Sequence, residues 1–384
     1  MEIEALRGEI DRIDDELVSL FLKRMGISLQ VAAYKQAHKL PVLDRTRERA
    51  LLSRVAAKSD DADMQLYIRL LYASLLGLSR SYQRKSGVGI QHTGLSSRIR
   101  ESAAKNAQNV LPASAVVACQ GVEGAYSSLA CERLFRHPDI MFFSSFDDVF
   151  SAVQQGLCRY GILPVENSTA GSVNRVYDLM ARHNFYIVKS VRLKVEHALL
   201  AKPGVKLADV REIFSHEQAI EQCSAFLSGL PNVRVTVCEN TAAAAKRVSE
   251  SDRADVAAIS SKDCMALYGL SMLGEGIQNN ANNYTRFICI GREPEIFSGA
   301  DKTSLMLTLP NRPGALYDVL SRFYALDINL LKLESRPKPG GDFEFLFYFD
   351  IEAPVYSENF LQMMDELEAS TEQFCYFGSY SELL

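Results

Sequence analysis

Arg24 occupies a position where the sequence pattern requires an apolar residue. From Ile3 to Tyr34 the apolar side chains follow a heptad repeat, and Arg24 stands where its next Leu or Ile is expected. An unpaired guanidinium buried in such a seam is costly, so it requires an anionic partner. Arg7 and Lys35 flank the same seam. Three cations on one helix face favour a site for a small anion with more than one carboxylate.

The same seam is compatible with a coiled coil in which Arg24 pairs with an acid and only sets the register. Two further helices favour the ligand site: one capped by Asp44, and one from about Asp63 to Gln83. Ser79 and Gln83 are four residues apart and therefore share a face. The first helix spans nearly forty residues, or about 55 Å, which is too long for a compact three-helix monomer. The pattern therefore predicts an all-α segment that dimerises by intertwining.

From Ala115 onward the pattern alternates between strands and helices. Strands are expected at 116–119, 160–165, 212–214, 233–237 and 256–259, which predicts an α/β domain with largely parallel sheets. Small hydroxyl and amide residues follow each strand, where helix N-termini favour anions. Helix capping is the simpler interpretation for Asn240-Thr241 and Ser260-Ser261. The five loops together predict a cleft for a second anionic small molecule.

The composition excludes several classes of protein. A chain of 384 residues should hold two or three domains, and a net charge of −5 argues against a nucleic-acid partner. No stretch of about 20 apolar residues is present to span a membrane, and the charged N-terminus does not resemble a signal peptide. The eight cysteines are scattered without a C-x-x-C pair. We therefore expect a cytoplasmic protein with reduced thiols and neither a metal nor another cofactor.

Residues 1–85 resemble the all-helical chorismate mutases. Chorismate is a dicarboxylate, and its rearrangement to prephenate is pericyclic, so catalysis requires a fixed conformer and stabilised charge on the ether oxygen. The resemblance implies these roles: Arg7 of the other subunit, Arg24 and Ser79 at the carboxylates; Lys35 and Gln83 at the ether oxygen; Glu48 and the Asp44 backbone at the ring hydroxyl; and Arg47 at Glu48 or the substrate.

Residues 86–113 are polar and are expected to form a solvated linker with a weakly helical stretch near 96–107.

Residues 114–293 resemble prephenate dehydratase. The matching motifs are Gly124–Ser127, Pro164–Ser168, Ser215-His216 with Gln222-Cys223, and Asn283–Phe287, which contains the family's Thr-Arg-Phe signature. Val122 departs from the proline that is usual in the first motif. The resemblance implies two α/β lobes like those of a periplasmic binding protein, with the site between them. It assigns substrate contacts to Tyr126, Ser127, Glu166, Asn167, Ser168, Ser215, His216, Gln222, Asn240, Thr241, Arg286 and Phe287.

The implied second reaction is a decarboxylative 1,4-elimination that converts prephenate to phenylpyruvate. It needs a proton donor at the departing ring hydroxyl. Family position makes Thr285 the candidate donor, with Glu166 or a bound water expected behind it to polarise the hydroxyl. His216 is the alternative acid on pKa grounds, but a His directly after a strand is often a helix-start residue and ranks below Thr285.

Residues 302–380 read as strand–helix–strand–strand–helix–strand, the ferredoxin-like α+β order. They resemble the ACT regulatory domain of prephenate dehydratases. The resemblance implies a phenylalanine pocket at a subunit interface, formed by Gly314, Ala315 and Leu316 with Glu334, Ser335, Arg336 and Pro337. A dimerisation module without a ligand is the alternative. The Glu-Ser-Arg-Pro turn favours the sensor, because folding alone does not require it.

Taken together, the motifs predict a bifunctional enzyme of phenylalanine biosynthesis that is inhibited by L-phenylalanine and forms a homodimer or tetramer. A fusion to an NAD-dependent prephenate dehydrogenase is excluded, because no strand–G-x-G-x-x-G–helix unit is present. A non-enzymatic amino-acid sensor with decayed sites is the second alternative. The intact polar sets in both domains argue against it, and an assay of chorismate consumption separates the two.

Overall fold

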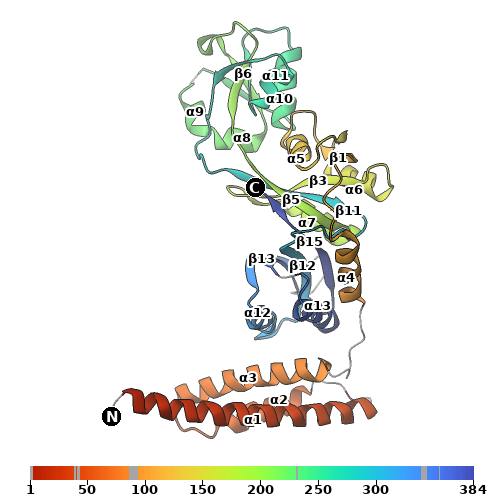
Figure 1. The fold of residues 1–384 in the computed structure, drawn as a ribbon. Helices are drawn as coiled ribbons and strands as arrows, with labels where there is room; N and C mark the ends of the chain where they lie inside the picture. Colours follow the sequence, from red (N-terminus) through yellow and green to blue (C-terminus); the bar gives the residue numbers. More distant parts are fainter. Residues whose placement is uncertain are drawn as a thin grey trace. The chain divides into compact units, whose positions relative to one another are not determined.

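The computed structural model describes residues 3–38, 40, 44–85, 94–230, 232–338, 344–353 and 355–384. They form two compact units. Figure 1 labels the helices and strands. The first unit is Met1–Ser96 with Arg312–Ala325 and Leu361–Thr371, and the second is Ser97–Asn311 with Leu326–Phe360 and Glu372–Leu384. Within the described ranges, no helix combines the length and the apolar character needed to cross a membrane.

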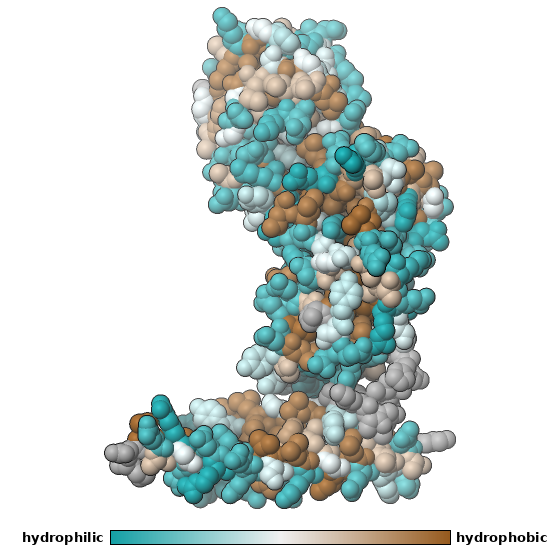
Figure 2. Space-filling view, in the orientation of Figure 1, coloured by the Kyte–Doolittle hydropathy of each residue, from teal (hydrophilic) through white to brown (hydrophobic). Residues whose placement is uncertain are grey.

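The first unit contains three N-terminal helices, as the apolar periodicity predicts: α1 (Ile3–Ala37), α2 (Arg45–Ala56) and α3 (Ala62–Lys85). Asp44 is the N-cap of α2, since its side chain accepts a hydrogen bond from the Arg47 backbone N–H at 3.0 Å. Much of the apolar seam of α1 is not covered within one chain, because Ile10 and Leu20 are more than half exposed. Figure 2 shows hydrophobic residues on the surface of this unit. The intertwined dimer remains a prediction that would cover such a seam.

The second unit begins with a lobe built on a seven-stranded sheet in the order β16-β5-β11-β3-β1-β2, with β4 paired to β3. Three helices, α5 to α7, accompany it. The bounds are β1 Val116–Gln120, α5 Tyr126–Leu134, β2 Asp139–Phe143, α6 Phe146–Gln154, β3 Tyr160–Asn167, β4 Gly171–Ser172, α7 Asn174–His183, β5 Tyr186–Lys194, β11 Tyr284–Gly291 and β16 Glu382–Leu383.

A second lobe, inserted between β5 and β11, contains a five-stranded sheet in the order β10-β6-β9-β7-β8. Its elements are β6 Ala198–Ala201, the 3₁₀ helix Leu207–Asp209, β7 Glu212–Ser215, α8 Glu217–Gln222, α9 Ser224–Ser228, β8 Arg234–Val237, α10 Thr241–Glu250, β9 Val256–Ser260, α11 Asp263–Leu267 and β10 Ser271–Gly274. All five expected strands are present, but the expectation of largely parallel sheets is wrong. The chain returns to the first lobe through β11, which lies antiparallel between β3 and β5, and β6 and β10 are antiparallel in the second sheet.

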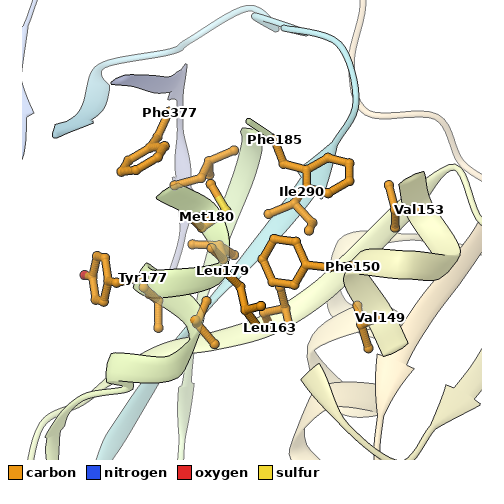
Figure 3. Packing of buried hydrophobic residues seen from close by; sticks show 14 of the residues in the cluster. Val149, Phe150, Val153, Leu163, Tyr177, Leu179, Met180, Phe185, Ile290 and Phe377 are labelled. Carbon is orange, nitrogen blue, oxygen red and sulfur yellow. The ribbon is translucent and has the colours of Figure 1, made fainter. Parts of the chain in front are cut away.

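A hydrophobic core cluster of the second unit joins the first lobe to the C-terminal strands. In Figure 3, Phe150 of α6 and Met180 of α7 pack with Leu163 of β3 and Ile290 of β11. Phe377, from strand β15 near the C-terminus, belongs to the same cluster. The dehydratase-like sheet and the C-terminal strands therefore share one hydrophobic core.

The C-terminal segment has the predicted order of elements: β12 Lys302–Leu309, α12 Ala315–Ala325, β13 Asn329–Pro337, β14 Phe345–Glu352, α13 Glu358–Ser370 and β15 Phe374–Tyr380. Its sheet order, β13-β14-β12-β15, is the ferredoxin-like one, and all its pairings are antiparallel. The last strand, β16, then leaves this sheet and pairs in parallel with β5 of the first lobe. The C-terminal end is thus an edge strand of the neighbouring sheet.

The predicted linker is more ordered than its polar composition indicates. Helix α4 (Leu95–Asn106) occupies much of it, and Ile99 and Ala103 are buried. The Ser102 hydroxyl donates to the Pro294 carbonyl at 2.6 Å and accepts from the Ile296 backbone N–H at 3.1 Å. The Lys and Arg residues of this stretch led to the prediction of a solvated linker, although its apolar residues follow a helical spacing.

Candidate active sites

The first candidate site lies between α1 and α3, around Arg24. The half-buried Arg24 guanidinium donates through one nitrogen to the hydroxyl of Ser79 and, at 3.4 Å, to the carbonyl oxygen of Leu75. Ser79 is almost fully buried, as is Gln83 one turn further along α3. The structure thus brings together Arg24 and Ser79, and it places Gln83 on the same helix face.

Glu48 of α2 is held by Arg80 rather than by Arg47. An Arg80 guanidinium nitrogen lies 2.5 Å from a Glu48 carboxylate oxygen, and both side chains are largely buried. The Arg47 side chain is exposed, and its backbone N–H serves the Asp44 cap. The expected alternative of Arg47 holding Glu48 is therefore corrected. The sequence analysis missed Arg80 because only the packing of α2 against α3 brings it to Glu48.

Arg7 lies too far from Arg24 to share a site with it in one chain. The two residues are 17 positions apart on α1, which corresponds to about 25 Å along the helix axis. Arg7 is exposed near the start of the helix, whereas Lys35 is half-buried near its end. If Arg7 serves a site like that around Arg24, it must serve the site of another copy.

The second candidate site lies where β3 and β11 pair. Asn167, the last residue of β3, is the register partner of Thr285 on β11. The Asn167 amide nitrogen donates to the Thr285 hydroxyl oxygen at 2.9 Å and to the Asn283 side-chain oxygen at 2.9 Å. The Asn167 oxygen accepts from the backbone N–H groups of Thr169 and Ala170, which fixes the orientation of the amide. All three interacting side chains are at least about nine-tenths buried.

This arrangement leaves the Thr285 hydroxyl proton available. Since the Thr285 oxygen accepts the Asn167 N–H, the hydroxyl can donate its own proton to another group. The expectation that Glu166 lies behind Thr285 is corrected, because the structure places the Asn167 amide there. The bound water, the other expected partner, stays a prediction. Glu166 lies on the opposite face of β3, with its carboxylate 3.4 Å from the Lys332 ammonium.

A chain of hydrogen bonds continues from Asn283 into the second lobe. The Gln222 side-chain oxygen accepts from the Asn283 amide at 3.0 Å and lies 2.9 Å from His197 Nε2. His197 is 2 % exposed, and burial lowers its pKa, so the ring is neutral and Nε2 carries the proton toward Gln222. Both donors occupy the Gln222 oxygen, so its NH₂ group remains to donate elsewhere. The sequence analysis missed His197, which lies outside every quoted motif.

Several other predicted residues serve local structure. The Ser215 hydroxyl donates to the Ile259 carbonyl at 2.8 Å, and His216 Nδ1 accepts from the Gln218 N–H as the N-cap of α8. The Asn240 side chain is the N-cap of α10, with Thr241 the first residue of that helix. Such contacts match the capping interpretation of these loops. Substrate contacts by these four residues remain predictions.

The remaining loop residues lie close to the connections between the lobes. The Tyr126 hydroxyl donates to the Glu196 carbonyl at 2.7 Å, and burial raises the pKa of this phenol. The Ser127 hydroxyl donates to the Gln120 carbonyl, and that of Ser168 donates to the Asn282 carbonyl at 3.2 Å. These contacts fix the loops that precede α5 and follow β3.

Arg286 and Phe287 do not lie beside the Thr285 hydroxyl. Neighbouring strand residues point to opposite faces, and the buried Arg286 guanidinium donates to Asp350 of β14 at 2.5 Å. Phe287 follows a β-bulge and is buried in the core around Tyr160 and Cys289.

The two predicted effector motifs lie on different elements, Gly314–Leu316 at the start of α12 and Glu334–Pro337 on β13. Gly314 has a φ of +81°, which favours glycine, and it directly precedes α12, where Ala315 is buried and Leu316 half-buried. On β13 the side chains alternate. Glu334 accepts from the Ser172 hydroxyl and Arg336 donates to Asp178 at 2.7 Å, whereas Ser335 and Pro337 are exposed.

Comparisons with known proteins identify the families of both regions that contain the candidate sites. Residues 6–84 match the model of chorismate mutase type II, and residues 117–295 match that of prephenate dehydratase. The bifunctional chorismate mutase/prephenate dehydratase of Enterobacter agglomerans is 31% identical over 98% of this chain and 95% of its own length. The arogenate dehydratase/prephenate dehydratase 2 of Arabidopsis thaliana is 40% identical over 69% of this chain and 72% of its own.

A solved structure shows the same fold over about two thirds of this chain. The prephenate dehydratase of Arthrobacter aurescens, in complex with L-Phe, is 28% identical, has a TM-score of 0.63, and covers 69% of this chain and 89% of its own. The two family models and the full-length relative together assign chorismate mutase and prephenate dehydratase activities to this protein. The chain belongs to the family of bifunctional chorismate mutase/prephenate dehydratases.

Proposed function

We propose that Thr285 donates the proton that leaves with the ring hydroxyl of prephenate. The observation that supports this most is the hydrogen bond from the Asn167 amide to the Thr285 oxygen. This bond leaves the hydroxyl proton free for the leaving group, and it stabilises the negative charge that grows on the Thr285 oxygen as the proton departs. A threonine hydroxyl is a weak acid in water, so such a fixed donor is the support that it requires.

The amides around Thr285 are proposed to orient the substrate. Asn283 is 1 % exposed, so the side chains around Thr285 are shielded from water. A carboxylate of the substrate that is poorly solvated there is lost more readily as CO₂. The Gln222 NH₂ group, which neither Asn283 nor His197 occupies, is the candidate donor to the side-chain carboxylate of prephenate. Prephenate would then bind between the lobes, since Asn167 belongs to the first and Gln222 to the second.

His197→Leu is expected to lower kcat/KM for prephenate about fivefold. The substitution removes one of the two donors that fix Gln222, and a hydrogen bond of this kind contributes about 1 kcal/mol. His197→Gln is the matched control, because its amide places a donor near the position of Nε2 and should restore most of the activity. Steady-state kinetics with prephenate measure both variants. Equal loss in the two would contradict the role of the donor.

For the mutase, we propose that Arg24 binds a chorismate carboxylate and that Arg7 of a second copy binds the other. Ser79 holds the Arg24 guanidinium, and Glu48, held by Arg80, accepts the ring hydroxyl. Lys35 and Gln83 are proposed to donate to the ether oxygen. The separation of about 25 Å between Arg7 and Arg24 supports an intertwined dimer, because one chain cannot bring both arginines to one substrate.

The C-terminal segment is proposed to be an ACT domain that binds L-phenylalanine and inhibits the dehydratase. The ferredoxin-like strand order and the L-Phe complex of the Arthrobacter aurescens relative support this. The effector would contact Gly314–Leu316 of one subunit and the exposed Ser335 face of β13 in a neighbour. Deleting residues from Lys302 onward is a poor test, because it also removes β16 and core residues such as Phe377 and Tyr380.

One assay tests the combined proposal. The protein is incubated with chorismate, with and without L-phenylalanine, while prephenate and phenylpyruvate are followed. We expect phenylpyruvate to form without effector, and prephenate to accumulate when phenylalanine is added, because inhibition acts on the second reaction alone. Gly314→Asp should abolish the effect of phenylalanine and spare both activities. Phenylpyruvate formation that is insensitive to saturating phenylalanine in the wild type would refute the sensor.

A further inference from the structure

The residues directly beside the proposed dehydratase site on the two paired strands belong to a partly buried cluster of charges. Arg286 follows Thr285 on β11, and Glu166 precedes Asn167 on β3. Because strand residues alternate, both charged side chains point away from the Thr285 hydroxyl, toward the C-terminal sheet. Their groups approach each other, with 3.8 Å between the Arg286 Nε and a Glu166 carboxylate oxygen.

Two charged residues of the C-terminal sheet meet this pair. Asp350 of β14 accepts the Arg286 hydrogen bond at 2.5 Å, and Lys332 of β13 lies 3.4 Å from the Glu166 carboxylate. Asp350 and Lys332 are register partners in the C-terminal sheet. Asp350 thus contacts Arg286 of β11, and Lys332 contacts Glu166 of β3. Lys332 also lies 3.4 Å from the carboxylate of Glu334 on its own strand, so it is shared between two acids.

The contact between Arg286 and Asp350 is the most buried part of the cluster. The side chains are 10% and 6% exposed, and among the described residues Asp350 is the only carboxylate hydrogen-bonded to Arg286. The other Asp350 oxygen accepts from the Ser304 hydroxyl at 2.5 Å, and Ser304 lies 2.7 Å from the Tyr380 hydroxyl. Asp350 is thus held by Ser304 of β12, which Tyr380 of β15 contacts in turn. A carboxylate held in this way determines where the Arg286 guanidinium sits.

We propose that Asp350 and Lys332 are positioning residues for the dehydratase, which act through Arg286 and Glu166 on the strand ends that carry Thr285 and Asn167. The distance between the Asn167 amide and the Thr285 oxygen depends on the register of β3 against β11, and the charge cluster joins those strands directly beside this pair. The C-terminal domain is then a structural part of the active site, whether or not it binds an effector. This inference rests on the proposed role of Thr285.

Asp350→Asn tests the proposal, because it keeps the shape and an acceptor for Ser304 but removes the charge. We expect kcat for prephenate to fall about 10- to 100-fold, since a misplacement of about 1 Å can reduce the rate about 100-fold, while KM changes less than about twofold. The mutase rate of the same protein should be unchanged, because that site lies in the first unit.

The matched control is Asp178→Asn. It breaks the 2.7 Å ion pair of Asp178 with Arg336, which joins helix α7 to β13 and does not involve β3 or β11. We expect its dehydratase kcat to stay within about twofold of the wild type. Two results would overturn the proposal. A similar loss of kcat in both variants would show no specific effect of Asp350 on β3 and β11, and a wild-type kcat in Asp350→Asn would show no effect at all.

Lys332→Met is a milder substitution that tests the proposal if Asp350→Asn does not fold. Lys332→Met keeps most of the side-chain stem, and Glu166, which is 37% exposed, can then be solvated. A three- to tenfold loss of kcat is expected, and full activity would count against the proposal. Thr285→Ala tests the underlying role separately. If that variant remains active while Asp350→Asn does not, the proton donor is another group, and Asp350 then acts on the strand ends through a residue other than Thr285.

Discussion

Thr285→Ala is expected to remove phenylpyruvate formation, so that prephenate accumulates from chorismate. The substitution deletes the proposed proton donor, and general acid catalysis typically contributes about 10²–10⁴-fold to a rate. The Asn167 amide would lose its acceptor at 2.9 Å, which is expected to cost about 1–3 kcal/mol of stability and to leave the protein folded. Product analysis after incubation with chorismate measures the effect.

Thr285→Ser is the matched control for this prediction. Serine keeps the hydroxyl that accepts from Asn167 and donates to the leaving group, so most of the dehydratase activity should remain. The mutase rate of both variants should stay at the wild-type level, because Arg24 and Thr285 lie in different compact units. A Thr285→Ala protein that dehydrates prephenate at nearly the wild-type rate would show that the proton comes from another group.

Arg24→Ala is expected to lower the mutase rate by about 10²–10³, the typical effect of removing one preorganised charge contact. The half-buried guanidinium is held by Ser79 and by the carbonyl of Leu75, so it is fixed before the substrate binds. Dehydratase activity on added prephenate should remain close to that of the wild type. Chorismate consumption and phenylpyruvate formation are measured separately on the same preparation.

Arg12→Ala provides the control on the same helix. Arg12 is an exposed cation of α1 whose Nε donates only to the nearby Gly8 carbonyl, at 3.4 Å, among the described residues. Its removal changes the net charge equally but leaves the Arg24 contacts intact, so the mutase rate should be unaffected. If both variants lost mutase activity to the same degree, general electrostatics of the helix would explain the loss better than a carboxylate contact.

The sequence by itself determined the features that depend on local spacing. A heptad repeat places Arg24 in an apolar seam, and a separation of four residues places Ser79 and Gln83 on one helix face. The capping roles of Asp44, His216 and Asn240 also follow from their positions directly before helices. Such features involve residues within one or two helical turns, so they do not depend on where the rest of the chain lies.

Only the tertiary structure decided which distant residues become neighbours. Asn167 meets Thr285 because β11 returns from the second lobe and pairs with β3, and the register of that pairing cannot be read from either strand alone. Arg80 reaches Glu48 through helix packing, and His197 reaches Gln222 across the second lobe.

The Thr-Arg-Phe motif shows this division within three residues. The sequence places Thr285 and Arg286 side by side, which suggested that both contact the substrate. In the structure, strand alternation points Thr285 toward the Asn167 amide and Arg286 toward Asp350, in a different sheet. Burial of a charged group depends on finding its partner, and the partner of Arg286 is 64 residues away in the sequence. The motif is therefore a local pattern, while the contacts between the two sheets decide that Thr285 and Arg286 have different partners and different roles.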